Sequence, residues 1–295
     1  MAVFHVIGLG SMGLGMALSL LRAGHEVHGL DLNPAQIAKL EEAGGQALAS
    51  TSPQADTLVC VVLNAAQTEA ALFGADGWSG HLKPGGTILS CATVAPDFAK
   101  RMEAEAQARG LHYLDAPISG GSVRAAEGAL SVMASGTPSA FDGAAEALDA
   151  MAQTVHRLGD KAGPGSAMKA VNQLLAGVHI AAMGEALGFA TSQGLDLARV
   201  LDVIRVSAGT SWMFENRAPH VIEADYTPRS SINIWPKDLG IVTDIAASAN
   251  LPLPLTEAAL AQYRAAAEAG LGQEDDAAIT KLVASRAGLK LPGDA

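Results

Sequence analysis

Alternation of hydrophobic and polar positions divides the first half of the chain into short apolar segments separated by amphipathic ones. Residues 57–63 form a near-continuous apolar run, which is typical of a strand buried on both faces. Residues 11–23 have helical periodicity instead and end at Gly24. The predicted strands cover residues 3–7, 26–30, 57–63, 87–89, 111–115, 130–134 and 154–158. This alternation of strands and helices predicts a mostly parallel, doubly wound sheet.

The pattern changes at the glycine-rich segment 159–165, beyond which only helical periodicity remains. The first helix after it, from 166 to about 193, would be ~42 Å long at about 1.5 Å per residue. Shorter helices are expected at 197–206, 212–223, 233–249, 256–269 and 275–286. We therefore predict an α/β N-terminal domain of residues 1–163. An all-α C-terminal domain of residues 164–295 should follow, opened by a long interdomain helix.

Composition and charge narrow the classes of function. Of the 295 residues, 49% are hydrophobic and 17% charged, which excludes a disordered chain. Thirty acidic against 19 basic side chains give a net charge of −11 without a basic block, which argues against a nucleic-acid partner. The two cysteines, Cys60 and Cys91, fit neither a disulfide framework nor a metal cluster, so no metal site is expected.

The sequence also predicts where the protein works. The most apolar long stretch, about residues 170–191, carries polar side chains such as Asn172, His179 and Glu185. Their cost in hydrocarbon argues against a membrane span. No signal peptide is visible, because the chain begins with a predicted strand. We therefore expect a cytoplasmic protein that does not act at a membrane.

A glycine motif follows the first strand and opens the first helix. In it, Gly8 allows the tight turn, Gly10 lets the backbone approach a pyrophosphate, and Gly13 allows close packing of helix on strand. The unpaired N–H groups at the helix start would bind the phosphates. The full predicted contact set is Gly8, Leu9, Gly10, Ser11, Met12 and Gly13. This context predicts a dinucleotide-binding (Rossmann-type) domain.

The ends of later strands add candidates for cofactor binding. Asp31 directly follows the second strand and lies 23 positions after Gly8, close to the spacing of about 20 at which an acid binds the ribose hydroxyls of NAD. It would repel the 2′-phosphate of NADP, so NAD is the expected cofactor; the alternative is a cap on the helix that begins at Pro34. Leu63 and Asn64 end the third strand and Thr93 follows the fourth, although Thr93 also fits an ordinary turn.

The segment after the strand at 111–115 can bind a carboxylate. Ser119 offers a hydroxyl, and Gly120 and Gly121 expose successive backbone N–H groups. Taken alone, a surface turn explains the same residues.

A lysine near the start of the long helix is the candidate acid/base. Lys169 and Asn172 share one helix face. The helix dipole and burial in a cleft would both lower the pKa of Lys169 and let it exchange a proton with a substrate hydroxyl. A solvated lysine is the alternative. Ser166 and Lys169 also match the Ser-x-x-Lys motif of penicillin-recognising hydrolases, but Ser-Asp-Asn and Lys-Thr-Gly are absent.

The order of these segments resembles the β-hydroxyacid dehydrogenase family, which includes 3-hydroxyisobutyrate dehydrogenase and tartronate semialdehyde reductase. The resemblance covers nearly the whole chain, and residues 207–217 and 226–230 are most similar to its L-threonate dehydrogenase branch. It implies NAD-dependent oxidation of a short hydroxyacid by a homo-oligomer, a dimer or tetramer, with L-threonate favoured. It implies Lys169 as general acid/base, Ser119, Gly120 and Gly121 on the substrate carboxylate, Asn172 orienting the substrate, and Lys237 reaching cofactor and substrate.

Two departures from the family pattern leave roles open. Some members carry the orienting Asn where this chain has Gln173, and many have Ser-Thr where this chain has Ala92-Thr93. Other substrates of the same family and a non-catalytic dinucleotide-binding module remain alternatives. An imine-reducing relative is disfavoured, because a lysine at the acid/base position indicates alcohol chemistry.

Overall fold

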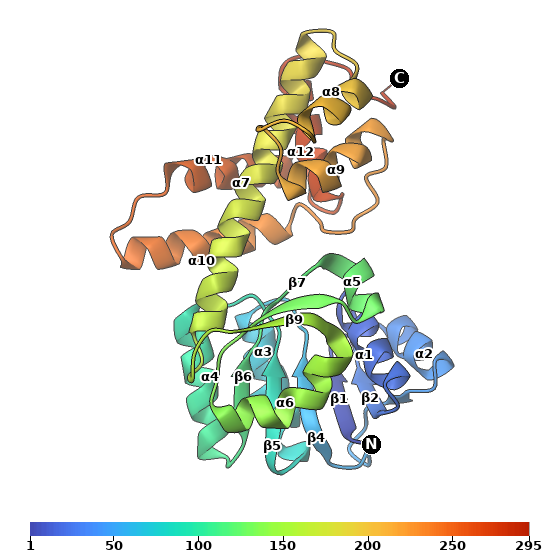
Figure 1. The fold of residues 1–295 in the computed structure, drawn as a ribbon, viewed down its shortest axis with the longest axis vertical. Coiled ribbons are helices and arrows are strands. Elements are labelled where there is room, and N and C mark those ends of the chain that lie inside the picture. Colours follow the sequence, from blue (N-terminus) through green and yellow to red (C-terminus); the bar gives the residue numbers. More distant parts are fainter. Residues whose placement is uncertain (295) are drawn as a thin grey trace. The chain divides into compact units, whose positions relative to one another are not determined.

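The computed structural model describes residues 1–294 and divides the chain into two compact units, Met1–Lys169 and Ala170–Ala295. Strands and helices alternate in the first unit, and the second consists of helices (Figure 1). The division falls inside helix α7 (Pro164–Ser192). An α/β unit followed by an all-α unit confirms the predicted fold class.

The α/β unit is built on a parallel sheet with the strand order β3-β2-β1-β4-β5-β6. Its strands are β1 (Val3–Ile7), β2 (Glu26–Leu30), β3 (Gln46–Ala47), β4 (Ala55–Cys60), β5 (Leu82–Ser90) and β6 (His112–Asp115). The connections contain α1 (Gly13–Arg22), α2 (Pro34–Glu42), α3 (Ala65–Phe73), the 3-10 turn η1 (Trp78–His81) and α4 (Pro96–Ala108). The strand order reverses between β1 and β4, and ligands of such sheets bind at the carboxyl ends beside this point.

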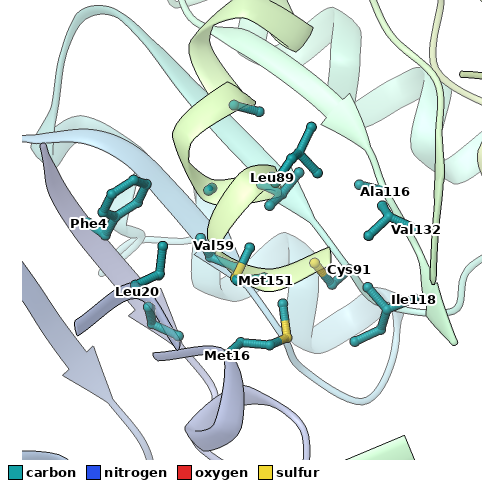
Figure 2. Packing of buried hydrophobic residues seen from close by; sticks show 14 of the residues in the cluster. Phe4, Met16, Leu20, Val59, Leu89, Cys91, Ala116, Ile118, Val132 and Met151 are labelled. Atoms are coloured by element: carbon teal, nitrogen blue, oxygen red, sulfur yellow. The ribbon is translucent and has the colours of Figure 1, made fainter. Parts of the chain in front are cut away.

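Alternate strand residues pack into two hydrophobic layers, one on each face of this sheet. Val59 and Leu89 contribute to the layer that also holds Met16 of α1 (Figure 2). Their neighbours Leu58 and Ile88 contribute to the opposite layer, with α3 and α4. Burial on both faces explains why these strands read as continuous apolar runs rather than alternating ones.

The last two predicted strands lie outside the main sheet. Strands β7 (Ile118–Ser119), β8 (Leu130–Ala134) and β9 (Ala152–Arg157) form a separate three-stranded sheet. The short helix α5 (Gly121–Glu127) returns the chain so that β8 runs antiparallel to β7. Helix α6 (Pro138–Met151) then crosses over, which makes β9 parallel to β8. The short antiparallel return after Ser119 therefore starts a new sheet instead of extending the first.

Helices α8 to α12 and the part of α7 that follows Lys169 form the second unit around a core of their own. They are α7, α8 (Leu197–Ile204), α9 (Trp212–Ile222), α10 (Ile234–Ser248), α11 (Pro254–Ala266) and α12 (Ile279–Arg286), with short turns at Ala267–Leu271 and Asp276–Ala278. Helix α7 is long and apolar enough, by length and composition alone, to cross a membrane. Its side chains Ile180, Met183 and Leu187 are buried in the helical core, however, as in the central helix of a globular protein.

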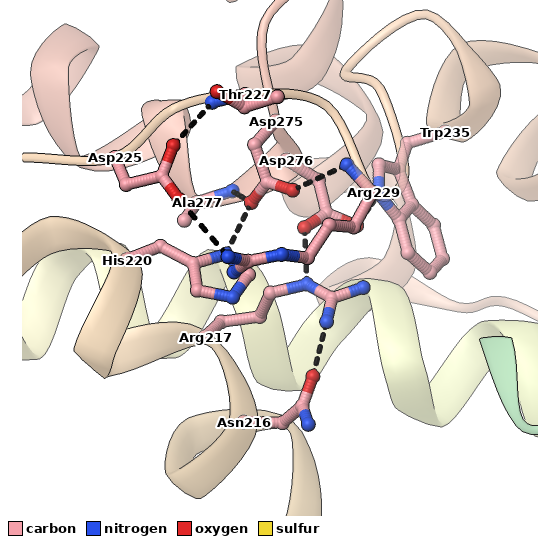
Figure 3. A network of polar contacts seen from close by, with 10 residues as sticks. All are labelled: Asn216, Arg217, His220, Asp225, Thr227, Arg229, Trp235, Asp275, Asp276 and Ala277. Atoms are coloured by element: carbon pink, nitrogen blue, oxygen red, sulfur yellow. Dashed lines mark hydrogen bonds and ion pairs between the residues drawn. The ribbon is translucent and has the colours of Figure 1, made fainter. Parts of the chain in front are cut away.

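A buried polar network ties the ends of this unit's helices together (Figure 3). The Arg217 guanidinium of α9 donates to Asp276 at 2.5 Å, and the Trp235 indole of α10 donates to the same carboxylate at 3.1 Å. The ring of His220 and the backbone N–H of Arg229 hydrogen-bond to the adjacent Asp275 at 2.8 and 3.0 Å. The network joins α9 and α10 to the turn before α12.

Candidate active site

The glycine motif forms a tight loop between β1 and α1. Gly8 has a φ of +90°, and a Cβ there would lie 2.3 Å from the carbonyl oxygen of Val61. A Cβ on Gly13 would lie 1.8 Å from the carbonyl oxygen of Gly8. A Cβ on Gly10 would meet no atom within 4 Å, which leaves that backbone open to a ligand. The loop therefore fits a dinucleotide pyrophosphate, as the spacing predicts.

The other members of the motif differ in exposure. The side chain of Leu9 is fully buried in the core, so its backbone is the part that a cofactor can reach. Ser11 is exposed and Met12 is half-buried. Their contacts with the cofactor remain predictions.

Asp31 holds the glycine loop from the end of β2. Its carboxylate accepts the backbone N–H of Leu9 at 2.6 Å and that of Asn33 at 2.8 Å. The side chain of Asn33 caps helix α2, so Asp31 does not cap it directly. A carboxylate offers about four acceptor positions, which leaves roughly two for ribose hydroxyls.

Register brings the other predicted cofactor segments to the same edge of the sheet. Parallel pairing aligns Ile7 with Cys60, and Cys60 with Ser90, so the segments after β1, β4 and β5 leave the sheet side by side. Leu63 is exposed, and the Asn64 side chain caps α3 by accepting the N–H of Gln67. Thr93 is half-buried after β5.

Lys169 lies beside the predicted carboxylate loop. It is 8% exposed, and its Nζ donates to the carbonyl oxygen of Ile118 at 2.9 Å. Ile118 directly precedes Ser119, which is half-buried at the end of β7. Gly120 and Gly121 follow with φ values of +134° and +77°, a backbone region that favours glycine. The structure thus brings the candidate acid/base to the segment predicted to bind the substrate carboxylate.

The second unit contains a chain of hydrogen bonds that links the other two candidates. Asn172 donates to the Gln173 side chain at 2.9 Å, and Gln173 donates to Asp238 at 2.5 Å. The Lys237 ammonium donates to the other oxygen of the same carboxylate. Gln173 and Asp238 are buried, whereas Asn172 is half-buried. Gln173 is therefore engaged with Asp238, and Asn172 is the more exposed of the two amides. Its contact with a substrate remains a prediction.

Comparison with known proteins identifies the family. Residues 4–159 match the model of the NAD binding domain of 6-phosphogluconate dehydrogenase. Residues 163–283 match the model named NAD-binding of NADP-dependent 3-hydroxyisobutyrate dehydrogenase. The chain belongs to the 3-hydroxyisobutyrate dehydrogenase family.

Relatives of this dehydrogenase family match along the whole chain. L-threonate dehydrogenase of Cupriavidus necator is 47% identical over 98% of both chains. NAD-dependent L-serine dehydrogenase of Pseudomonas aeruginosa is 32% identical over 94% of this chain and 96% of its own. The crystal structure of 3-hydroxyisobutyrate dehydrogenase from Salmonella typhimurium is 45% identical, with a TM-score of 0.90 over 96% of this chain and all of that one. The protein is an NAD-dependent hydroxyacid dehydrogenase, as the glycine motif and the family resemblance together predict.

Sequence reasoning missed the roles of two acids in this dehydrogenase. Asp115 ends a predicted strand, yet it pairs with Ser166, 51 residues away along the chain. Asp238 follows the candidate Lys237, yet it pairs with Gln173, 65 residues away. No local sequence pattern predicts such a pairing. The structure also counts against the hydrolase alternative: the Ser166 hydroxyl is 1% exposed and donates to Asp115 at 2.7 Å.

Among residues 1–294, no group of three or more His, Cys, Asp or Glu side chains is arranged to hold a metal ion. The cysteines Cys60 and Cys91 are buried, and burial raises the pKa of the Cys60 thiol to about 12. Both act as core residues.

Proposed function

We propose that the enzyme oxidises L-threonate or a closely similar short polyhydroxy acid with NAD. The 47% identity to a full-length L-threonate dehydrogenase supports this substrate. The loop at Ser119 suits its carboxylate, and the half-buried Asn172 suits one of its hydroxyls. A surface-exposed Arg124 on α5 adds positive charge near this loop.

The contact of Lys169 with Ile118 carries the catalytic assignment. It puts a buried amine next to the backbone that we assign to the substrate carboxylate. Bound NAD supplies the hydride acceptor, held by the loop at Gly8–Gly13 and by Asp31. Lys169 takes the proton of the substrate hydroxyl as the hydride leaves the carbon that bears it. The remaining work of the protein is orientation of the two reactants.

The roles of the second unit follow from the same proposal. We assign Asn172 to orienting the substrate and Lys237 to cofactor and substrate, both held through Gln173 and Asp238. Residues 1–163 would then bind the cofactor, with Leu63, Asn64 and Thr93 among its contacts. Residues 164–295 would complete the substrate site and form subunit contacts. We also propose that the enzyme is located in the cytoplasm.

A panel of hydroxyacids tests the substrate. Initial rates of NADH formation should give a kcat/KM for L-threonate at least about tenfold above that for 3-hydroxyisobutyrate, equal to ~1.4 kcal/mol. 3-Hydroxyisobutyrate is the second candidate substrate, because a protein named 3-hydroxyisobutyrate dehydrogenase is 45% identical to this chain. Faster turnover of it would overturn the L-threonate assignment and leave the family intact. Tight NAD binding without turnover of any hydroxyacid would favour a non-catalytic module.

We further propose that a second copy of the chain covers an apolar groove on the helical unit. The groove holds about 860 Å³, and Phe189, Leu195 and Val203 on its lining are more than half exposed. Exposed apolar surface of this kind is typical of an interface, and a twofold contact pairs one patch with itself. Light scattering should give a multiple of 30.0 kDa. A particle of 30.0 kDa at micromolar concentration would contradict this.

A further inference from the structure

The carboxylate of Asp115 is buried at the end of β6, where it meets four hydrogen-bond donors. The side chain is 1% exposed. One oxygen accepts the backbone N–H groups of Gly163 and Ser166 at 3.0 and 2.9 Å and the Ser135 hydroxyl at 3.2 Å. The other oxygen accepts the Ser166 hydroxyl at 2.7 Å. Burial raises the pKa of this carboxyl and the four donors oppose the rise. They match the ionised form, which can only accept.

These contacts fix the turn that starts helix α7. Ser135 accepts the N–H of Gly165 at 2.9 Å, so the side-chain oxygens of Asp115 and Ser135 together accept three backbone N–H groups of this one turn. A Cβ on Gly165 would lie 2.4 Å from the carbonyl oxygen of Met133 and 2.7 Å from that of Asp115. The helix start is therefore packed directly on the end of β6 and on β8. Little freedom remains for the first turn of α7.

Asp115 lies close to the groups that hold both ends of the Lys169 side chain. Lys169 follows Ser166 by three residues, so its Cα is carried by the turn that Asp115 holds. Its Nζ bonds to the carbonyl of Ile118, which follows Asp115 by three residues. We propose that Asp115, through Ser135 and Ser166, is a positioning residue that sets the Lys169 amine against the substrate loop. This rests on the proposed function, in which Lys169 is the acid/base.

Substitutions at Asp115 and Ser166 test the proposal by kcat. Asp115→Ala should lower kcat by about 10- to 10²-fold, the cost of a displacement of about 1 Å. Asp115→Asn should lose less, because its amide oxygen can still accept the two N–H groups while its NH₂ donates to Ser166. Ser166→Ala keeps the helix and should lose rate to an intermediate extent. NAD affinity should stay near the wild-type value in all three. The exposed Asp142→Ala is the control and should match wild type.

The double variant separates positioning from a general loss of structure. If Asp115 acts through Lys169, then adding Asp115→Asn or Ser166→Ala to Lys169→Ala should cause little further loss of kcat. The proposal would be overturned if the fold-losses of kcat in the single variants multiplied fully in the double variant. It would also be overturned if Ser166→Ala and Asp115→Asn were both folded and kept the wild-type kcat. If Asp115→Ala does not fold, those two variants decide. If Lys169→Ala keeps its rate, the proposed function itself fails, which is a distinguishable result.

Discussion

In the α/β unit the buried Asp115 carboxylate meets neutral backbone and hydroxyl donors, whereas in the helical unit the buried Asp276 carboxylate meets the Arg217 guanidinium. Asp115 holds one turn, the one that leads to the predicted acid/base. Asp276 and its neighbour Asp275 hold together helices that are distant in sequence. Asp115 therefore orders a segment of the proposed site, whereas Asp276 maintains the packing of its own unit.

The two carboxylates of the helical network also differ from each other. Burial raises the pKa of Asp276, against the effect of Arg217. Burial acts likewise on Asp275, but hydrogen bonds from His220 and from the N–H groups of Arg229 and Ala277 outweigh it and leave the pKa below its usual value. The charge on Asp276 thus depends mainly on the Arg217 guanidinium, with the Trp235 indole as a further donor, so removal of Arg217 should destabilise the unit.

The largest effect should come from Lys169 and should fall on rate alone. Lys169→Ala should lower kcat by roughly 10²–10⁴, the usual loss for a positioned acid/base. NAD affinity and unfolding should change little, because alanine is at least as good a helix former and the cofactor contacts lie elsewhere. Steady-state kinetics and urea denaturation measure both. The exposed Lys161→Ala is the matched control. A variant that keeps its kcat, or loses rate only with its fold, would refute the assignment.

The next effect should come from Arg217 and should fall on stability. Arg217→Ala leaves the Asp276 charge buried without its cation, and such losses cost about 3–5 kcal/mol of unfolding free energy. Urea denaturation followed by intrinsic tryptophan fluorescence, to which Trp235 inside the network contributes, measures it. The control is Arg205→Ala, which breaks an exposed pair with Asp202 and should cost about 0–1 kcal/mol. Equal losses in the two variants would contradict the structural role of the buried pair between Arg217 and Asp276.

Local sequence signals predicted the parts of the molecule that depend on neighbours in the chain. The glycine loop and the helix after Asn33-Pro34 lie where the motifs place them. Helix α7 spans Pro164–Ser192, close to the predicted 166–193, and the later helices α9 and α10 match within one or two residues. Each of these rests on periodicity, a cap or a turn residue, which act over a few positions.

Pairings between residues that are distant in sequence could not be predicted from these local signals. The strand at 130–134 was expected, but its membership of a second sheet depends on the antiparallel return from Ser119. Asp115 ends the strand predicted at 111–115, and its partner Ser166 is 51 residues away. Arg217 and Asp276 are 59 residues apart. Partner choice across such distances is decided by packing, which one sequence does not display.

The third largest effect should come from acid, which should lower the stability of the α/β unit before that of the helical unit. His5 on β1 is fully buried, and burial, with nearby His28 and His81, lowers its pKa from 6.5 to about 4, against the bond to the Pro53 carbonyl. The unfolded chain binds more protons in this interval, so stability is lost as pH falls from about 6.5 towards 4. The slope should reach at most about 1.4 kcal/mol per pH unit.

The helical unit should resist this range of pH. The lowered pKa of Asp275 keeps that carboxylate charged until the pH falls below the usual aspartate range, so its contribution is lost later. Denaturation followed at Trp78, in the α/β unit, should therefore show the earlier loss. His5→Phe keeps an aromatic ring against Trp78 and should flatten the slope. An unchanged slope in that variant would assign the acid sensitivity to another group.

The smallest effect should concern cofactor choice, which lies in the α/β unit. Asp31 accepts two backbone N–H groups and keeps acceptor capacity for a ribose hydroxyl, while the adjacent Leu32 is 99% exposed and offers no cation. Wild type should therefore prefer NAD over NADP by at least about tenfold in kcat/KM, or ~1.4 kcal/mol. Asp31→Ala combined with Leu32→Arg should shift the ratio towards NADP, since the repulsion of the 2′-phosphate is replaced by attraction. Leu32→Arg alone is the control, because it adds the cation and keeps the carboxylate. The readout is the ratio of kcat/KM with NAD to kcat/KM with NADP, because Asp31→Ala also removes the contact with the Leu9 N–H and so weakens binding of both cofactors. Equal efficiency of wild type with NAD and NADP would show that Asp31 serves only the glycine loop.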